Sequence, residues 1–239
     1  MPHMARFFFP ILFWSPDILE DQLAVGKFTL HKRKWEVSIF DLYTIAAQKP
    51  PIHFTAGLAE IFLGKVNCEI SVEGKQIEEA QSELDVLRAM LYTEGLSPTI
   101  APYSSNYSLN AYAGINGRSS SIRQKEMPEG LRKGITTADT HVDMYAYEVT
   151  FDCIGSQPED LVKLDAKTFE DACNRAEIWK RIENHANHAK AARRAFVKSP
   201  LIPDLGSSLL QVWQGIVACC RFSGHPPKLT RPASRIQQG

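Results

Sequence analysis

The chain has 239 residues, of which 44% are hydrophobic and 23% are charged. This composition is typical of a folded globular protein and excludes intrinsic disorder, collagen-like repeats and disulfide scaffolds. The formal net charge is zero, but the residues from Arg175 onward carry eleven Lys or Arg and three acids, a net +8. This basic end predicts either an anionic partner such as RNA or DNA, or neutralisation by the acidic remainder of the chain.

Cysteine usage and hydropathy indicate the compartment. The five cysteines are odd in number and have no C-x-x-C spacing, which favours reduced thiols and a cytoplasmic protein. No run reaches the roughly 18 uncharged apolar residues that a membrane helix needs, so we expect no membrane partner. The apolar run at 7–14 lacks a small-residue cleavage site after it and predicts a buried first strand, with Pro10 at a sheet edge or a bulge.

The first half of the chain predicts a sheet with one packed helix. Residues 24–31 and 35–43 are expected to form two strands joined by the charged turn at 32–34, because the second segment is rich in β-branched and aromatic residues. Residues 61–72 predict a further strand, since apolar and polar residues alternate from Val66 to Val72. A buried helix follows, with Gly95 as its stop signal and apolar residues at helical spacing, namely Ile77, Ala80, Leu84, Leu87 and Leu91.

The middle of the chain predicts loops and then a domain boundary. Residues 95–138 are rich in Ser, Gly, Asn and Pro and are expected to be loops around a short strand at 106–113, whereas 143–151 alternates as a strand does. The segment Gly155-Ser156-Gln157-Pro158 interrupts that alternation. We therefore expect an α+β domain over 1–155, a helical region over 156–222 and a basic proline-rich tail over 223–239.

The helical region predicts two helices and a homodimer. Residues 168–198 are expected to form one long helix with Thr168 as its N-cap, and 205–222 a second, apolar helix. A hairpin of two helices cannot bury both apolar faces alone, so it should pack on the sheet, on another partner or on a second copy of itself. The fold class expected is α+β: a mostly antiparallel sheet with a packed helix, followed by a C-terminal helical hairpin.

Chemical motifs are few. No phosphate-loop, dinucleotide-binding or esterase signature occurs, so no cofactor is expected. Two clusters contain metal-ligand residue types, Asp139 with His141 and Asp143 at a strand entry, and His185 with His188 on the predicted long helix. A polar strand entry and a solvated helix face account for them, and we assign no metal.

The predicted long helix carries Arg181 and His188 with six residues between them. This spacing resembles the R-x4–6-H motif of HEPN ribonucleases, a family of small helical bundles. The segment LLQVWQGIV at 209–217 is similar to the leucine and tryptophan helix of bacterial HEPN proteins of the ApeA type, and the resemblance extends over 165–222. It implies a metal-independent endoribonuclease in which Arg181 holds the scissile phosphate and His188, or His185, moves the proton of a ribose 2′-hydroxyl.

Three functions remain open. The leading hypothesis is a non-catalytic binding protein, which the resemblance would make a HEPN-type defence or toxin-related protein. Its basic helical end would contact RNA or another anionic macromolecule. A ribonuclease is the second hypothesis, and Ile182 weighs against it because the family usually has a polar residue after the motif arginine. The third is a protein–protein scaffold whose basic end docks on the acidic half. The candidate nucleic-acid-binding residues are Arg175, Lys180, Lys190, Arg193, Arg194 and Lys198.

Overall fold

The computed structural model describes residues 4–35, 37–47, 53, 55–96, 99–110, 142–147, 161–202 and 204–220. The chain divides into two compact units, the first ending at Arg181 and the second beginning at Ile182. The division falls after Arg181 and not near residue 155, because Leu164, Phe169 and Ala172 belong to the core of the first unit. The fold class is α+β, as the sequence predicted.

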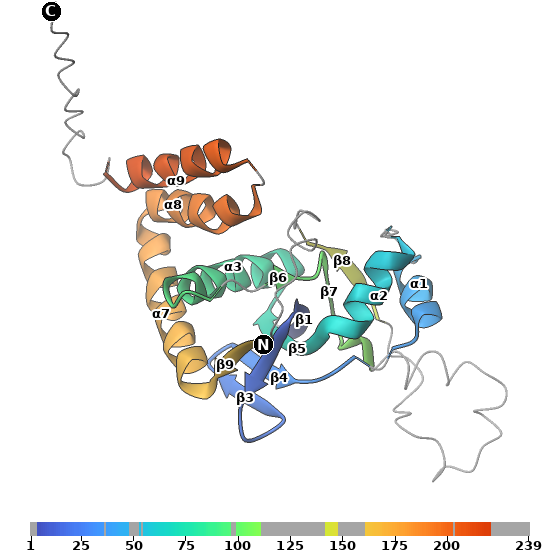
Figure 1. Ribbon diagram of the computed structural model, residues 1–239. Coiled ribbons are helices and arrows are strands. Elements are labelled where there is room, and N and C mark those ends of the chain that lie inside the picture. The colour runs from blue at the N-terminus through green and yellow to red at the C-terminus, as the bar shows by residue number, and fades with distance from the viewer. Residues whose placement is uncertain are drawn as a thin grey trace, which may run out of the picture. The chain divides into compact units, whose positions relative to one another are not determined.

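A mostly antiparallel sheet is the centre of the first unit (Figure 1). Its strand order is β3-β4-β5-β1-β7-β8, with β6 also pairing with β1, and every one of these pairs is antiparallel. The strands are β1 Ala5–Leu12, β3 Gln22–Val25, β4 Phe28–Lys32, β5 Val66–Gly74, β6 Thr99–Ile100, β7 Tyr103–Ser105 and β8 Met144–Ala146.

The first strand is an interior strand, so the edge position expected for Pro10 is wrong. The carbonyl of Pro10 accepts the N–H of Ala101 at 3.0 Å, and Ala101 lies between β6 and β7. The ring nitrogen of Pro10 points to the same side as its carbonyl. The neighbouring strand is interrupted on that side, so the lack of an N–H donor at Pro10 costs little. The expected irregularity is present one residue later, as a register shift between Ile11 and Leu12.

A second, two-stranded sheet joins distant parts of the first unit. Strand β2, Trp14–Asp17, runs parallel to β9, Val162–Asp165, in a region that the sequence predicted to be wholly helical. Phe13 turns the chain from β1 into β2 at a φ of 63°, a conformation that is unfavourable for a bulky side chain. Its N–H donates to Lys65 at 3.0 Å and its carbonyl accepts from Val162 at 2.8 Å, which holds the turn in place.

The hairpin predicted from strands at 24–31 and 35–43 lies instead within 22–32, because the first predicted strand is itself a hairpin. Strands β3 and β4 meet through a two-residue turn at Gly26 and Lys27, where Gly26 has a φ of +58° that glycine adopts readily. Instead of a strand, part of the second segment forms helix α1, Ile39–Ala46. Ser38 is its N-cap and accepts the N–H of Asp41 at 3.1 Å, so the local capping signal outweighed the strand-like composition.

Two further helices of the first unit flank β5 in the chain. Residues 61–65, expected as strand, belong to helix α2, Ala56–Lys65, which is followed directly by β5. The predicted buried helix is confirmed as α3, Ile77–Thr93, and Gly95 after it has a φ of +75°. Residues 106–108 are not strand and Leu109 begins a helical segment, which corrects the start of the strand expected at 106–113. Its remainder lies outside the described residues.

The first unit contains two hydrophobic clusters. One lies between the sheet, α3 and the first part of α7 (Ala166–His185), and includes Phe9, Ile70, Leu87 and Phe169. The other gathers α1, α2 and the end of β1 around Phe62, Tyr103 and Trp35. The rings of Phe62 and Tyr103 meet edge to face at a centroid distance of 5.5 Å.

The predicted long helix is two helices, which is a correction. Helix α7 ends at His185, Ala186 has an extended φ of −142°, and α8 runs over Asn187–Lys198. The cap of α7 is Asp165 in place of Thr168, because the Asp165 carboxylate accepts from the N–H of Thr168 at 2.9 Å and from its hydroxyl at 2.7 Å. The backbone hydrogen bond, and then the hydroxyl bond, lower the pKa of Asp165.

The second unit is a helical hairpin. The short 3-10 helix Ser199–Leu201 connects α8 to α9, Leu205–Cys220, and the two helices lie side by side (Figure 1). The C-terminal hairpin predicted from sequence is therefore present, built from α8 and α9. Among the helices described here, none is both long enough and apolar enough to cross a membrane.

Candidate nucleic-acid interface

Two basic residues on α7 are engaged by acidic side chains of α3 and its C-cap. Arg175 forms an ion pair with Glu94. Lys180 lies 3.0 Å from the carboxylate of Glu83, which is buried and also pairs with Lys27 at 3.2 Å. Part of the basic excess is thus neutralised inside the first unit, and Arg175 and Lys180 are poorly placed to contact nucleic acid.

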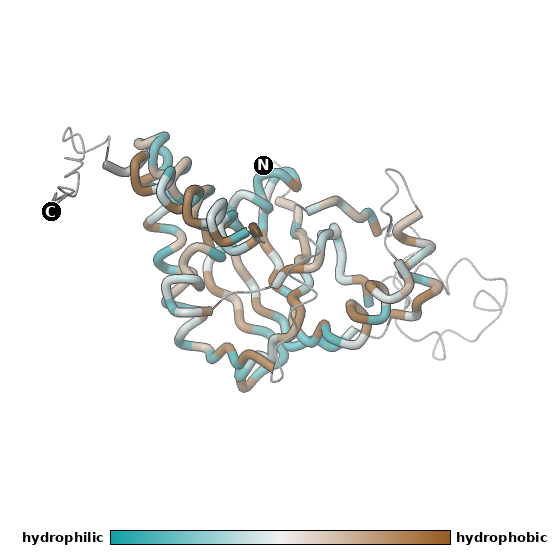
Figure 2. Tube along the Cα trace, turned by 45° about the horizontal axis from the view of Figure 1, so that its top comes forward, coloured by the Kyte–Doolittle hydropathy of each residue, from teal (hydrophilic) through white to brown (hydrophobic). Residues whose placement is uncertain are grey.

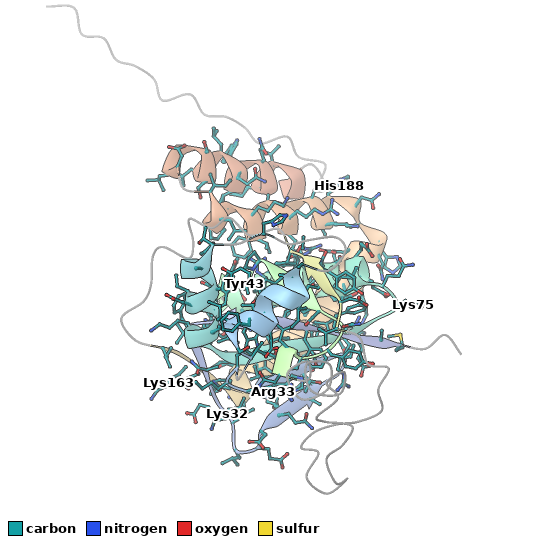
Figure 3. All side chains as sticks on the ribbon, turned by 90° about the vertical axis from the view of Figure 1, so that its right-hand side faces the viewer. Lys32, Arg33, Tyr43, Lys75, Lys163 and His188 are labelled. Carbon is teal, nitrogen blue, oxygen red and sulfur yellow. The ribbon has the colours of Figure 1, made fainter. Side chains whose placement is uncertain are left out.

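The three candidate catalytic residues do not share one regular helix. Arg181 has a largely exposed side chain and lies 4.0 Å from Glu177, one turn earlier on α7. His185 is the last residue of α7, and His188 is exposed in the first turn of α8 (Figure 3). Because the backbone breaks at Ala186, the helical spacing that placed Arg181 and His188 on one face does not hold.

Arg193 is buried, contrary to its expected role in binding nucleic acid. Its Nε donates to Glu183 at 2.6 Å and its Nη2 donates to the other carboxylate oxygen at 3.4 Å. Both side chains are at most 3% exposed. This two-bond ion pair fastens the start of the second unit to α8, and it removes Arg193 from any surface that RNA could reach.

The remaining cations of α8 form a stripe. Lys190, Arg194 and Lys198 follow one another at intervals of four residues, so they lie on one face of the helix. Arg194 and Lys198 are exposed and Lys190 is half-buried. Helix α8 contains no acidic residue. We call these three residues the basic stripe, and they are the part of the predicted footprint that the structure brings together.

Helix α9 presents a different surface. It has no charged residue along its length, and brown, hydrophobic turns recur along it in Figure 2. Five large apolar side chains on it are between 47% and 73% exposed. We call them the α9 apolar face: Leu205, Leu209, Leu210, Trp213 and Ile216.

A buried polar cluster on the sheet escaped the sequence interpretation. The carboxylate of Glu69, on β5, accepts hydrogen bonds from Trp35 Nε1 at 3.0 Å and Ser108 Oγ at 2.8 Å, and Arg33 lies 3.2 Å away. Burial raises the pKa of Glu69, and the hydrogen bonds and the charge of Arg33 oppose that rise. The alternation of polar and apolar residues on β5 does signal a polar face, but it does not show that this face is buried.

His31 extends the same cluster. Its Nε2 lies 2.8 Å from the hydroxyl of Ser71, and both side chains are buried. Burial, followed by the charges of Arg33 and Arg6, lowers the pKa of His31 to about 4. A histidine beside a serine is a combination that nucleophilic enzymes use, but with 3% and 0% exposure this pair meets no solvent. It is a structural hydrogen bond.

Metal-ligand residue types do not converge in the part of the chain that the structure describes, where no three His, Cys, Asp or Glu side chains are grouped for an ion. Of the cluster at 139–143, Asp143 alone lies within that part, and its N–H donates to the side chain of Asn106 at 2.9 Å. Cys68 and Cys173 are buried free thiols, and burial raises the pKa of each. The other three cysteines carry no described side chain.

Comparisons with known proteins found no relative of this chain. No protein-family model, no curated protein and no solved structure matches the chain.

Proposed function

We propose that this protein is a non-catalytic binding protein whose helical unit contacts RNA through the basic stripe of Lys190, Arg194 and Lys198. The observation that carries the proposal is the alignment of these three cations on a helix without acids. Lys and Arg at this spacing can follow the phosphates of a nucleic-acid strand. The tail beyond residue 220 adds four Lys or Arg and no acid, which increases the attraction for a polyanion.

The test is a salt titration of single-stranded RNA binding with a charge-matched control. The variant Lys190→Gln/Arg194→Gln/Lys198→Gln is expected to weaken binding for all RNA sequences. It should also lower the slope of log affinity against log salt by about 2, since each neutralised phosphate contributes about 0.7. The control Lys32→Gln/Lys34→Gln/Lys163→Gln removes three exposed lysines of the first unit, two of which Figure 3 labels.

The control is expected to bind RNA as the wild type does. Equal loss in both variants would show that net charge alone attracts RNA and would contradict a defined stripe. Unchanged binding in the stripe variant at low salt would place the RNA contact outside the basic stripe. A wild type that binds no RNA at low salt would favour the scaffold hypothesis, in which the second unit contacts protein.

We also propose that copies of the chain associate through the hairpin, since the α9 apolar face gathers five exposed large apolar side chains on a helix without charged residues. The likeness to HEPN proteins supports a ribonuclease only if Arg181 and His188 converge. In that case RNA cleavage should persist in a chelator and disappear in Arg181→Ala and in His188→Ala. We expect no cleavage, because the helix breaks between these residues.

A further inference from the structure

The packing of α9 against α8 determines which helix faces point outward. Gly215 of α9 approaches α8 so closely that a Cβ added to it would lie 3.0 Å from the Cβ of Ala195 and 3.2 Å from the carbonyl oxygen of Ala192. Small residues at this point let the two backbones meet. They also identify the inner face of each helix.

The basic stripe and the α9 apolar face lie on opposite sides of this hairpin. Gly215 contacts both Ala192 and Ala195 of α8. At 100° per residue, Lys190 and Arg194 lie about 170° and 130° around α8 from the midpoint of these two contacts, and Lys198 about 90°. The stripe therefore points away from α9 at Lys190 and Arg194 and sideways at Lys198. On α9, Leu209 and Trp213 are about 120° and 160° from Gly215, so the apolar face points away from α8. One hairpin therefore has a cationic outer side and an apolar outer side.

We infer that the α9 apolar face pairs with the same face of a second copy, and that the pair bridges two RNA segments through its two outer basic stripes. The second part of this inference rests on the proposed RNA binding. In a two-fold pair the α9 helices lie in the middle and the α8 helices outside, which gives four packed helices in place of two. The two stripes then point away from each other.

Area and charge both favour a second copy as the occupant. Aromatic side chains bury about 150–250 Å² each, and Leu and Ile are somewhat smaller. At exposures of 47% to 73%, the five residues therefore offer on the order of 500 Å² per copy. Two copies would bury about 1,000 Å² between them, which is the size at which a specific interface begins. Helix α9 carries no charge, so its own copy meets no like-charge repulsion there.

Pairing is measured by sedimentation at micromolar concentration and on dilution. Bridging is measured by whether a biotinylated RNA held on beads retains a second, fluorescent RNA when the protein is added. We expect the wild type to be a dimer and to retain the second RNA. The variant Leu209→Ser/Trp213→Ser should be monomeric, keep its helical circular dichroism, still bind one RNA, and reduce retention to the level without protein.

Matched variants separate pairing from RNA binding. Leu19→Ser/Phe40→Ser removes two exposed apolar side chains of the first unit and should leave both dimer and bridging unchanged. The stripe variant Lys190→Gln/Arg194→Gln/Lys198→Gln should remain a dimer and bind RNA, and therefore bridge it, more weakly than the wild type. A dimeric wild type that binds no RNA would therefore contradict the proposed function and the bridging while leaving the pairing supported.

A charge complementation test confirms that the partner is a second copy. Leu209→Glu and Leu209→Lys should each be monomeric, and an equimolar mixture should recover the dimer because opposite charges then meet across the interface. A monomeric wild type at every concentration would overturn the inference, and so would a Leu209→Ser/Trp213→Ser variant that still forms dimers.

Discussion

In the first unit, Phe9, Ile11 and Ile70 are completely buried between the sheet and its helices, whereas in the second unit the five side chains of the α9 apolar face are 47% to 73% exposed. The hairpin is held by the close packing of Gly215 against Ala192 and Ala195, and by the buried ion pair of Arg193 and Glu183. The apolar side chains of the first unit are therefore buried within that unit, whereas much of the apolar surface of α9 is exposed.

The largest effect is expected from truncating the core of the first unit. Phe9→Ala should lower the free energy of unfolding by about 3–5 kcal/mol, because it removes a fully buried ring and leaves a cavity. Leu209→Ala, on the α9 apolar face, should change the unfolding free energy of the monomer by less than about 0.5 kcal/mol. Urea denaturation measures both. A comparable loss in the two variants would show that α9 is already covered within one chain.

The buried ion pair should be the weak point of the second unit. Arg193→Met leaves the Glu183 carboxylate buried without its partner, and we expect a loss of about 3 kcal/mol within the hairpin. Hydrogen exchange of the α8 amides measures the loss locally. The double variant Arg193→Met/Glu183→Leu should regain most of the protection, since no buried charge then remains. If Arg193→Met alone exchanged as the wild type does, the pair would not hold the hairpin.

His31 should make the first unit sensitive to acid. Its pKa of about 4 lies below the usual value of 6.5, so the unfolded chain binds the proton first as the pH falls. The stabilisation is complete above pH 6.5 and is lost between pH 6.5 and 4, by up to about 3 kcal/mol at 1.36 kcal/mol per pH unit. Urea unfolding over this pH range should be less pH-dependent in His31→Gln than in the wild type. Equal slopes would contradict the assignment.

The smallest effect concerns the N-cap of α1. Ser38→Ala removes the side-chain acceptor for the N–H of Asp41 and should lower the unfolding free energy by about 1 kcal/mol. Ser38→Thr keeps both the acceptor for the N–H of Asp41 and the hydroxyl that donates to the Asp41 carboxylate at 2.8 Å, and it should retain the stability of the wild type. Thermal unfolding followed by circular dichroism distinguishes the two. Equal stability of the wild type and Ser38→Ala would mean that packing alone holds α1 in place.

The sequence alone determined features that depend on short-range periodicity. The apolar spacing from Ile77 to Leu91 predicted α3, and Gly95 predicted its end, because helical repeats and glycine stops are local signals. Residues 205–222 predicted α9 in the same way, and strands before helices predicted the α+β class. The excess of basic residues from Arg175 onward was also predictable, because net charge follows from the sequence alone.

Only the tertiary structure decided which of these charges are available. Arg193 and Arg194 are adjacent and chemically identical, yet one is buried against Glu183 and the other is exposed, because the break at Ala186 lets the chain fold back on itself. Strand β9 was missed because its partner β2 lies far away in the sequence. The polar face of β5 could not be recognised as buried, because alternation shows two faces of a strand and only the packed fold shows what covers each.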